Sequence, residues 1–337
     1  MSSRLLTPAD DYLHAVGAEQ SWNESRYIDF YDSEAGVGGW LRLGMRPNER
    51  HAEMSACLNL PGGRAAFYYE RAPVAGNRLV AGGQEWTIGD PYRASTVSYH
   101  GPVLMLDDPW LLTDPKQAFA TSPRQHASID LRVETKGLGA VMGADQDHID
   151  LIFLPGQADW HYQHLCWVTG TAEVGDQSFE ISGKGGKDHS WGPRNWLAKI
   201  YLRWLIATSD DDELGFMLVR AVGPTKKTCG GHVWESGDFY LADGVQLTNT
   251  YAARAPYELR RTEITIRSGE REWTAVGTPE AWVPLRHRAK DESGDPALLR
   301  IVKSPTRWAF SDGRQGVGMC EIHDRLDRAG LPAGIKD

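Results

Sequence analysis

Residues 129–134 read Ile129-Asp130-Leu131-Arg132-Val133-Glu134, a strict alternation of apolar and charged side chains. A period of two is typical of a β-strand that buries one face and exposes the other. Two pairs of strand-like runs also flank polar turns: residues 163–174 and 178–183 around Gly175-Asp176, and residues 200–208 and 214–222 around residues 209–212. Because such hairpins join neighbouring antiparallel strands, the sequence predicts a mainly antiparallel, all-β protein.

Length and composition indicate two domains. The chain has 337 residues, more than one hydrophobic core usually serves, and it contains 13 Trp and 36 Gly. Strand-like runs recur about every ten residues, a spacing found in β-barrels and β-sandwiches. A boundary near residues 155–165 divides the chain into residues 1–160 and 161–337. Since no low-complexity linker separates these halves, we expect two barrel or sandwich domains packed against each other.

Charge and hydropathy argue against several classes of protein. The formal net charge is −9, without the basic patch that nucleic-acid binding needs. No run approaches the roughly 20 apolar residues of a membrane-spanning helix, and residues 1–11 lack the apolar core of a signal peptide. We therefore expect a cytoplasmic protein that binds neither nucleic acid nor membrane. The four cysteines form no CxxC pair, so no zinc or redox motif is predicted.

The stretch richest in chemical groups is residues 183–196, which read Gly-Lys-Gly-Gly-Lys-Asp-His-Ser-Trp-Gly-Pro-Arg-Asn-Trp. On an extended backbone, His189 and Trp191 fall on one face and Asp188 and Ser190 on the other. A His beside a Trp suits a cavity wall, with Asp188 fixing the local geometry. A structural corner, in which Asp188 accepts backbone N–H groups and Trp191 plugs a barrel end, explains the same residues equally well.

The Asp188-His189-Ser190-Trp191-Gly192 run after a glycine-rich strand resembles the D-H-x-W-G signature of the hydroxyneurosporene-synthase (carotenoid 1,2-hydratase) and AttH-like group. A Trp-rich β pattern and the late run Gly316-Val-Gly-Met-Cys-Glu321 are similar to that group as well. The resemblance implies two lipocalin-like (calycin) domains with an apolar small-molecule cavity between them. It also connects the chain to kievitone-type hydratases and to the lipocalin-like pericyclases of polyketide pathways.

In the carotenoid hydratases, the His and Trp of this motif are taken as active-site residues, with a Tyr-x-Asp pair on a following strand. The resemblance therefore implies catalytic roles for His189 and Trp191. The comparable strand here, residues 215–220, reads Gly-Phe-Met-Leu-Val-Arg and lacks the pair. This departure argues against carotenoid hydration itself and leaves the acid unassigned.

Hydration of a C=C bond needs a proton donor, a positioned water and a site that stabilises a carbocation, for which aromatic faces are suited. Asp188, His189 and Trp191 offer one such set, and Glu235 is our candidate for the missing acid, with Asp238 in reserve. A strand pattern alone also explains the spacing around Glu235. Cyclisation would use the same catalytic groups without the water, and a pericyclic reaction would need fewer of them. The predicted substrate-binding residues are Arg194, Asn195, Trp196, Tyr201, His232 and Trp234.

Two main hypotheses follow. The first is a cofactor-independent lyase or isomerase (a hydratase, dehydratase or cyclase) acting on an apolar isoprenoid, steroid or polyketide-like molecule. The second is a non-catalytic carrier of a similar ligand, which the absent Tyr-x-Asp pair favours. A glycosidase would need two carboxylates that point toward each other, and the sequence singles out no such pair. No metal-ligand spacing, P-loop or nucleophile elbow occurs, so we expect neither metal nor cofactor.

Overall fold

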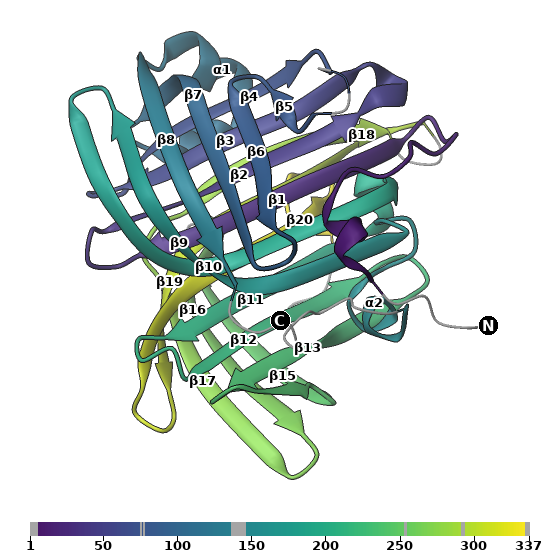
Figure 1. Ribbon diagram of the computed structural model, residues 1–337, viewed down its shortest axis with the longest axis vertical. Helices are drawn as coiled ribbons and strands as arrows, with labels where there is room; N and C mark the ends of the chain where they lie inside the picture. The colour runs from purple at the N-terminus through teal and green to yellow at the C-terminus, as the bar shows by residue number, and fades with distance from the viewer. Residues whose placement is uncertain are drawn as a thin grey trace.

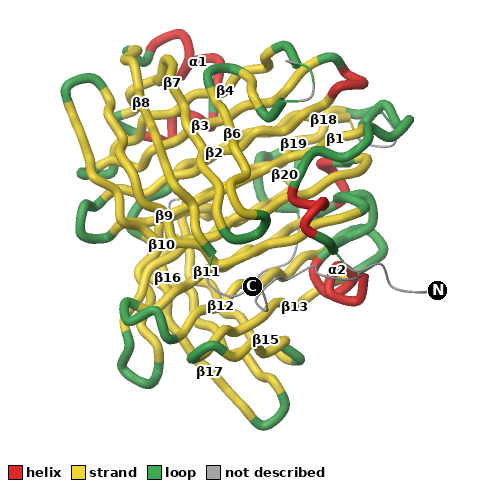
Figure 2. Tube along the Cα trace, in the orientation of Figure 1, coloured by secondary structure: helices red, strands yellow, loops and turns green. Residues whose placement is uncertain are grey.

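The computed structural model describes residues 6–74, 76, 78–135, 146–252, 255–290 and 294–333. Two ten-stranded antiparallel sheets account for most of this part of the chain. Figure 2 shows strands almost everywhere, with short helices at the margins. These are α1 (Pro115–Thr121), α2 (Gln146–Ile152) and the 3-10 turns η1 (Pro8–Asp11), η2 (Pro47–Glu49), η3 (Pro109–Thr113) and η5 (Trp196–Ala198). The all-β prediction is confirmed.

The first sheet has the strand order β4-β3-β2-β1-β10-β9-β8-β7-β6-β5, and a further pairing of β4 with β7 closes it into a ring. A closed ring leaves few unpaired strand edges and encloses a core. Its strands are β1 (Trp22–Asp32), β2 (Val37–Arg46), β3 (His51–Leu60), β4 (Arg64–Ala72), β5 (Val80–Ala81), β6 (Gln84–Asp90), β7 (Ala94–Leu106), β8 (Arg124–Glu134), β9 (Trp160–Val174) and β10 (Gln177–Pro193).

The second sheet has the order β14-β13-β12-β11-β20-β19-β17-β16-β15, with β18 pairing to β19. Both predicted hairpins are present, as β9–β10 and β11–β12. The strands are β11 (Tyr201–Ser209), β12 (Leu214–Val222), β13 (Lys227–Glu235), β14 (Asp238–Leu241), β15 (Gly244–Ala252), β16 (Ala255–Ser268), β17 (Arg271–Pro279), β18 (Val283–Lys290), β19 (Pro296–Phe310) and β20 (Gln315–Leu326).

The two sheets divide the chain later than the predicted domain boundary. The first sheet keeps β9 and β10 and ends at Pro193, whereas the second begins at Tyr201. The reason is that β10 pairs with β1, so the hairpin that follows residue 160 completes the ring begun at residue 22. The boundary between residues 160 and 161 itself stays a prediction. Within the described ranges, no helix has the length and apolar character needed to cross a membrane.

The sheets pack against each other through β1 and β10 on one side and β11, β19 and β20 on the other. Figure 1 shows the ring above and the second sheet below, with these strands between them. Separate hydrophobic clusters fill the ring, the space between the sheets and the second sheet's own core. Trp40 and Trp204 belong to the cluster between the sheets. The predicted packing of two β units against each other is therefore confirmed.

The glycines of the motif make this packing close. A Cβ on Gly186 would lie 2.6 Å from Ile206 Cδ1 and 2.8 Å from Met217 Cε, both on the opposing sheet. Within each sheet, a Cβ on Gly185 would collide with the backbone carbonyl oxygen of Asp29 on the paired strand β1, and one on Gly318 with that of Ile206 on the paired strand β11. Side chains at these positions would separate strands that must touch. The glycine-rich stretch thus marks where the sheets meet.

Candidate functional site

A cavity of about 540 Å³ lies between the two sheets. Small-molecule sites usually fall within roughly 300–1,000 Å³. Part of its wall is aromatic, with Tyr27 and Trp40 from the ring and Trp204 from the second sheet. The Tyr27 and Trp204 rings lie 5.5 Å apart across the gap between the sheets. The wall also carries many charged groups, so the predicted apolar cavity has a mixed lining.

Asp188 lines this cavity. On β10 it stands directly opposite Tyr27 of the paired strand β1, so both side chains lie on the face toward the second sheet. Burial raises the pKa of the Asp188 carboxyl to about 6, although Arg194, Arg42 and Lys303 act in the opposite direction. A carboxyl with such a pKa is protonated in a useful fraction near neutral pH and can donate a proton.

A chain of polar groups continues from Tyr27 into the second sheet. The Lys303 ammonium donates to the Tyr27 hydroxyl at 2.8 Å, and that hydroxyl donates to Asp29 Oδ2 at 3.0 Å. Lys303 also forms an ion pair with Glu321, its partner in the β19–β20 register, and Glu321 contacts His323. Burial lowers the pKa of Lys303 and raises that of Asp29. Such perturbed, connected groups are typical of active sites.

Two predicted substrate-binding residues also line the cavity, and a third has a different role. Arg194 donates to the hydroxyls of Ser190 and Ser25, at 3.1 and 3.3 Å, and its guanidinium stacks over Trp196. Both Arg194 and Trp196 belong to the wall. Asn195 instead caps the short turn η5, because its Oδ1 accepts from the Leu197 backbone N–H at 2.8 Å.

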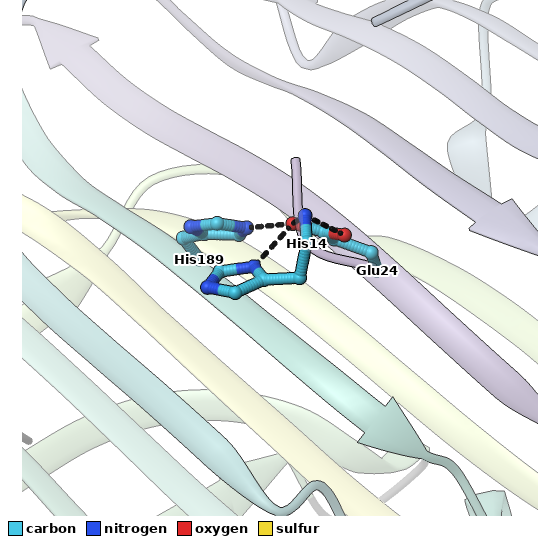
Figure 3. A group of neighbouring side chains, drawn as sticks. All are labelled: His14, Glu24 and His189. Atoms are coloured by element: carbon cyan, nitrogen blue, oxygen red, sulfur yellow. Dashed lines mark hydrogen bonds and ion pairs between the residues drawn. The ribbon is translucent and has the colours of Figure 1, made fainter. Parts of the chain in front are cut away.

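His189 and Trp191 lie on the other face of β10, as the period of two predicts, and they do not line the cavity with Asp188. His189 is 0% exposed, and its Nε2 lies 2.9 Å from Glu24 Oε1. His14, from the segment that follows η1, reaches the same carboxylate oxygen through Nδ1, also at 2.9 Å. Figure 3 shows both imidazoles converging on Glu24. Trp191 stacks on His14 with ring centroids 3.9 Å apart.

These side chains belong to a larger buried network that fastens the N-terminal segment to the ring. Arg26 pairs with Asp11 at 3.0 Å and approaches His189 Nδ1 at 3.4 Å. Tyr162 donates to Asp11 as well, and the Tyr92 backbone N–H donates to Asp11 Oδ2 at 2.7 Å. Each buried charge thus has a partner, as a stable interior requires. The structural interpretation of His189 fits these contacts.

His14, Glu24 and His189 are the described residues whose donor atoms could hold a metal ion, since those atoms lie within 4.8 Å of one another. Two imidazoles and a carboxylate would suit a transition metal. The contacts fit a hydrogen-bonded cluster instead. Arg26 is placed to donate to His189 Nδ1, which leaves Nε2–H to donate to Glu24. A fully buried guanidinium beside the cluster also repels a divalent cation.

The remaining predicted residues lie away from the cavity wall. Glu235, at the end of β13, forms an ion pair at 3.1 Å with the exposed Arg271, and both lie outside the cavity between the sheets. His232 is buried against Phe239, with centroids 4.7 Å apart, and Trp234 packs against the inter-sheet cluster. Tyr201 lies beneath the Arg203 guanidinium. None of these four lines the cavity.

Sequence reasoning missed the residues that complete the site. The strand after the motif lacks a Tyr-x-Asp pair, but Tyr27 and Asp29 form one on β1, which pairs with the motif strand. Glu321 closes the Gly316–Glu321 run, whose glycines allow close packing of β20. In the sequence, the feature that could have identified Lys303 as a site residue is a single Lys in an apolar strand. Lys199, buried beside η5, gave no signal.

Comparison with solved structures finds the same fold at low sequence identity. A protein of Nitrosomonas europaea provisionally called AttH is 13% identical, with a TM-score of 0.55 over 96% of this chain and 97% of that one. CghA is 10% identical, with a TM-score of 0.56 over 94% and 90%, and its structure with Sch210972 matches equally well. Kievitone hydratase from Nectria haematococca is 10% identical, with a TM-score of 0.46 over 89% and 87%.

The predicted likeness to AttH-type proteins is thus confirmed at the level of fold, whereas the likeness to hydroxyneurosporene synthase stays a prediction. A search of the curated proteins found no match. The family match is to DUF7064, described as a domain of unknown function, over residues 7–326. Since that match covers nearly the whole sequence, the chain belongs to the DUF7064 family.

Proposed function

We propose that the protein is a cofactor-independent lyase or isomerase, a hydratase, dehydratase or cyclase, acting on a hydrophobic isoprenoid, steroid or polyketide-like molecule. The observation that carries the proposal is the Asp188 carboxyl, whose pKa is raised to about 6 in a cavity with aromatic walls. A carrier gains nothing from an acid held in this state, whereas a proton-transfer enzyme requires one.

In the proposed reaction, Asp188 gives its proton to one carbon of a C=C bond, and the positive charge develops on the other carbon. The face of Trp204 stabilises that charge, at about 0.5–2 kcal/mol for a close contact, whereas the rings of Tyr27 and Trp40 already contact the Lys303 ammonium. Water then adds to the cation and loses its proton to a carboxylate, for which Glu321 is placed in the wall. If the substrate's own second double bond attacks the cation instead, a ring closes and the positive charge moves to the other carbon of that second bond. Loss of a proton from the adjacent carbon to Glu321 then gives a neutral cyclic alkene.

One comparison structure supports a small-molecule ligand for this fold. CghA has been crystallised with Sch210972 and shares the fold over 94% of this chain. Carriage without conversion is the alternative, and an experiment that separates binding from turnover decides between the two.

The test is native mass spectrometry of the protein after incubation with an extract of apolar metabolites. We expect wild type to retain a ligand and to release a product altered in mass by one water, or unaltered in mass but changed in chromatographic retention. Val219→Trp, which adds bulk at a buried cavity position, should lose both binding and product. Val16→Trp, at a half-exposed position, is the matched control. Retention of an unchanged ligand by wild type would support the carrier instead.

A further inference from the structure

The charge of the cavity wall is opposite to that of the protein. The whole chain carries a formal net charge of −9. The wall, by contrast, includes the carboxylates Glu53, Asp188 and Glu321 but a larger set of Lys and Arg side chains: Arg42, Arg71, Lys116, Arg194, Lys199, Arg286, Arg288 and Lys303. Low-dielectric walls concentrate such a field inside the cavity. A ligand with negative charge is therefore favoured there.

The cations are gathered most closely around Trp196. The guanidinium carbons of Arg194 and Arg42 lie 4.7 and 5.2 Å from its ring centroid, and the Lys199 ammonium lies 5.4 Å from it. Three like charges around one indole repel one another. Cation–π contacts offset only part of this repulsion, at about 2 kcal/mol each when desolvated. Glu53, 3.7 Å from Arg42, and Asp188 are the carboxyl groups that act on these cations, so the positive charge around Trp196 is only partly balanced.

Lys199 is the cation of this cluster that, in the described part of the chain, most clearly lacks a hydrogen-bonding partner. It is 3% exposed and lines the cavity, and no hydrogen bond or ion pair to its ammonium exists among the described residues. Arg42 Nη2 is also buried without a hydrogen-bond partner, and its Nη1 is 3.7 Å from Glu53. Burial and the neighbouring Arg194, Lys303 and Arg42 lower the pKa of Lys199. An unpaired buried ammonium is costly, so its retention at a cavity wall points to a ligand.

We infer that the substrate is an amphipathic acid, whose carboxylate or similar oxyanion lies against Lys199, Arg194 and Arg42 beside Trp196. Its apolar body extends toward Trp40, Phe67 and Trp204, which line the same cavity. Arg194 also donates to Ser190, two residues beyond Asp188, so the oxyanion lies near the acid. The negative charge then favours the protonated form of Asp188, the form that donates. This inference rests on the proposed function, because it uses the same cavity.

The test compares an acid with the alcohol of the same skeleton. Farnesoic acid and farnesol share fifteen carbons, and shorter pairs such as decanoic acid and decanol cover a smaller ligand. Binding is measured by isothermal titration calorimetry at neutral pH. Wild type should bind each acid at least about tenfold more tightly than its alcohol. Lys199→Met should remove about tenfold of the acid's affinity and leave that of the alcohol within about threefold. Lys227→Met, at an exposed position, should change neither.

Folding of the variant gives a second measurement. Because Lys199→Met removes an unpaired buried charge and keeps the apolar stem, its melting temperature should equal or exceed that of wild type. Alcohols that bind as tightly as acids would overturn this inference and leave the proposed function standing. A preference for acids without any conversion would uphold the inference and favour the carrier. If no acid or alcohol binds, both proposals fail.

Discussion

Replacing His189 with alanine is expected to lower the free energy of unfolding by about 3–5 kcal/mol, because it breaks a buried charge network. His189 is 0% exposed and donates to Glu24. Burial alone would raise the pKa of Glu24, but hydrogen bonds from His14 and His189 lower it to about 2, so the carboxylate stays charged. Without His189, that charge keeps one imidazole partner and faces a new cavity. Urea denaturation followed by circular dichroism measures the loss.

His126→Ala, at an exposed position of β8, is the control and should change stability by less than about 0.5 kcal/mol. Burial and Arg26 lower the pKa of His189 to about 4. Between its ordinary value of about 6.5 and pH 4, the unfolded chain binds more protons, so wild type should lose stability as pH falls through this window. His189→Ala should lack that part of the slope. A variant as stable as wild type but inactive would restore the catalytic interpretation.

The fold was predictable from local patterns because side chains along a β-strand alternate between a buried face and an exposed face. Residues 129–134 lie in β8, with Ile129, Leu131 and Val133 buried and their charged neighbours exposed. The hairpins at residues 175 and 209–212 are where turn residues interrupt that alternation. Which strands close the ring could not be predicted, because the β1–β10 pairing joins residues about 160 positions apart and depends on packing.

The same alternation placed Asp188 and His189 on opposite faces of one strand. It could not predict which part of the structure each face contacts. Asp188 meets a cavity, whereas His189 meets the N-terminal segment. The prediction that both act in one site therefore separates into two clusters. Glu235 illustrates the same limit: its pattern placed it on a strand, but only the tertiary structure shows it paired with Arg271 at the surface.

The missed residues depend on contacts that no local window contains. Lys303 reaches Tyr27 across 276 residues of sequence, and Tyr27 reaches Glu321 across 294. A buried Lys or Glu in an apolar strand is the only local sign that such a partner exists, because an unpaired charge would not be tolerated there. Lys303 and Glu321 both sit in such strands.

Replacing Asp188 with asparagine should reduce conversion of the bound ligand by about 10²- to 10⁴-fold, the usual contribution of general acid catalysis. The amide has nearly the same shape and keeps the wall intact, so ligand affinity should change by less than about tenfold. Single-turnover measurements on preformed complexes separate the two quantities. Asp176→Asn, at the exposed turn of the β9–β10 hairpin, is the matched control and should convert ligand at the wild-type rate.

The pH dependence identifies the group. Burial raises the pKa of Asp188 to about 6, and the acid is the protonated form, so wild-type conversion should fall above that pH by about tenfold for each unit. The neighbouring groups that could obscure this limb are Asp29, whose pKa burial raises, and Lys303, whose pKa burial lowers. Tyr27 stays protonated, because burial raises its pKa well above the usual value. Asp188→Asn should lack the limb. If the variant retains both the rate and the limb, the proton comes from another buried group, Asp29 or the Lys303–Glu321 pair, and Asp188 is not the catalytic acid.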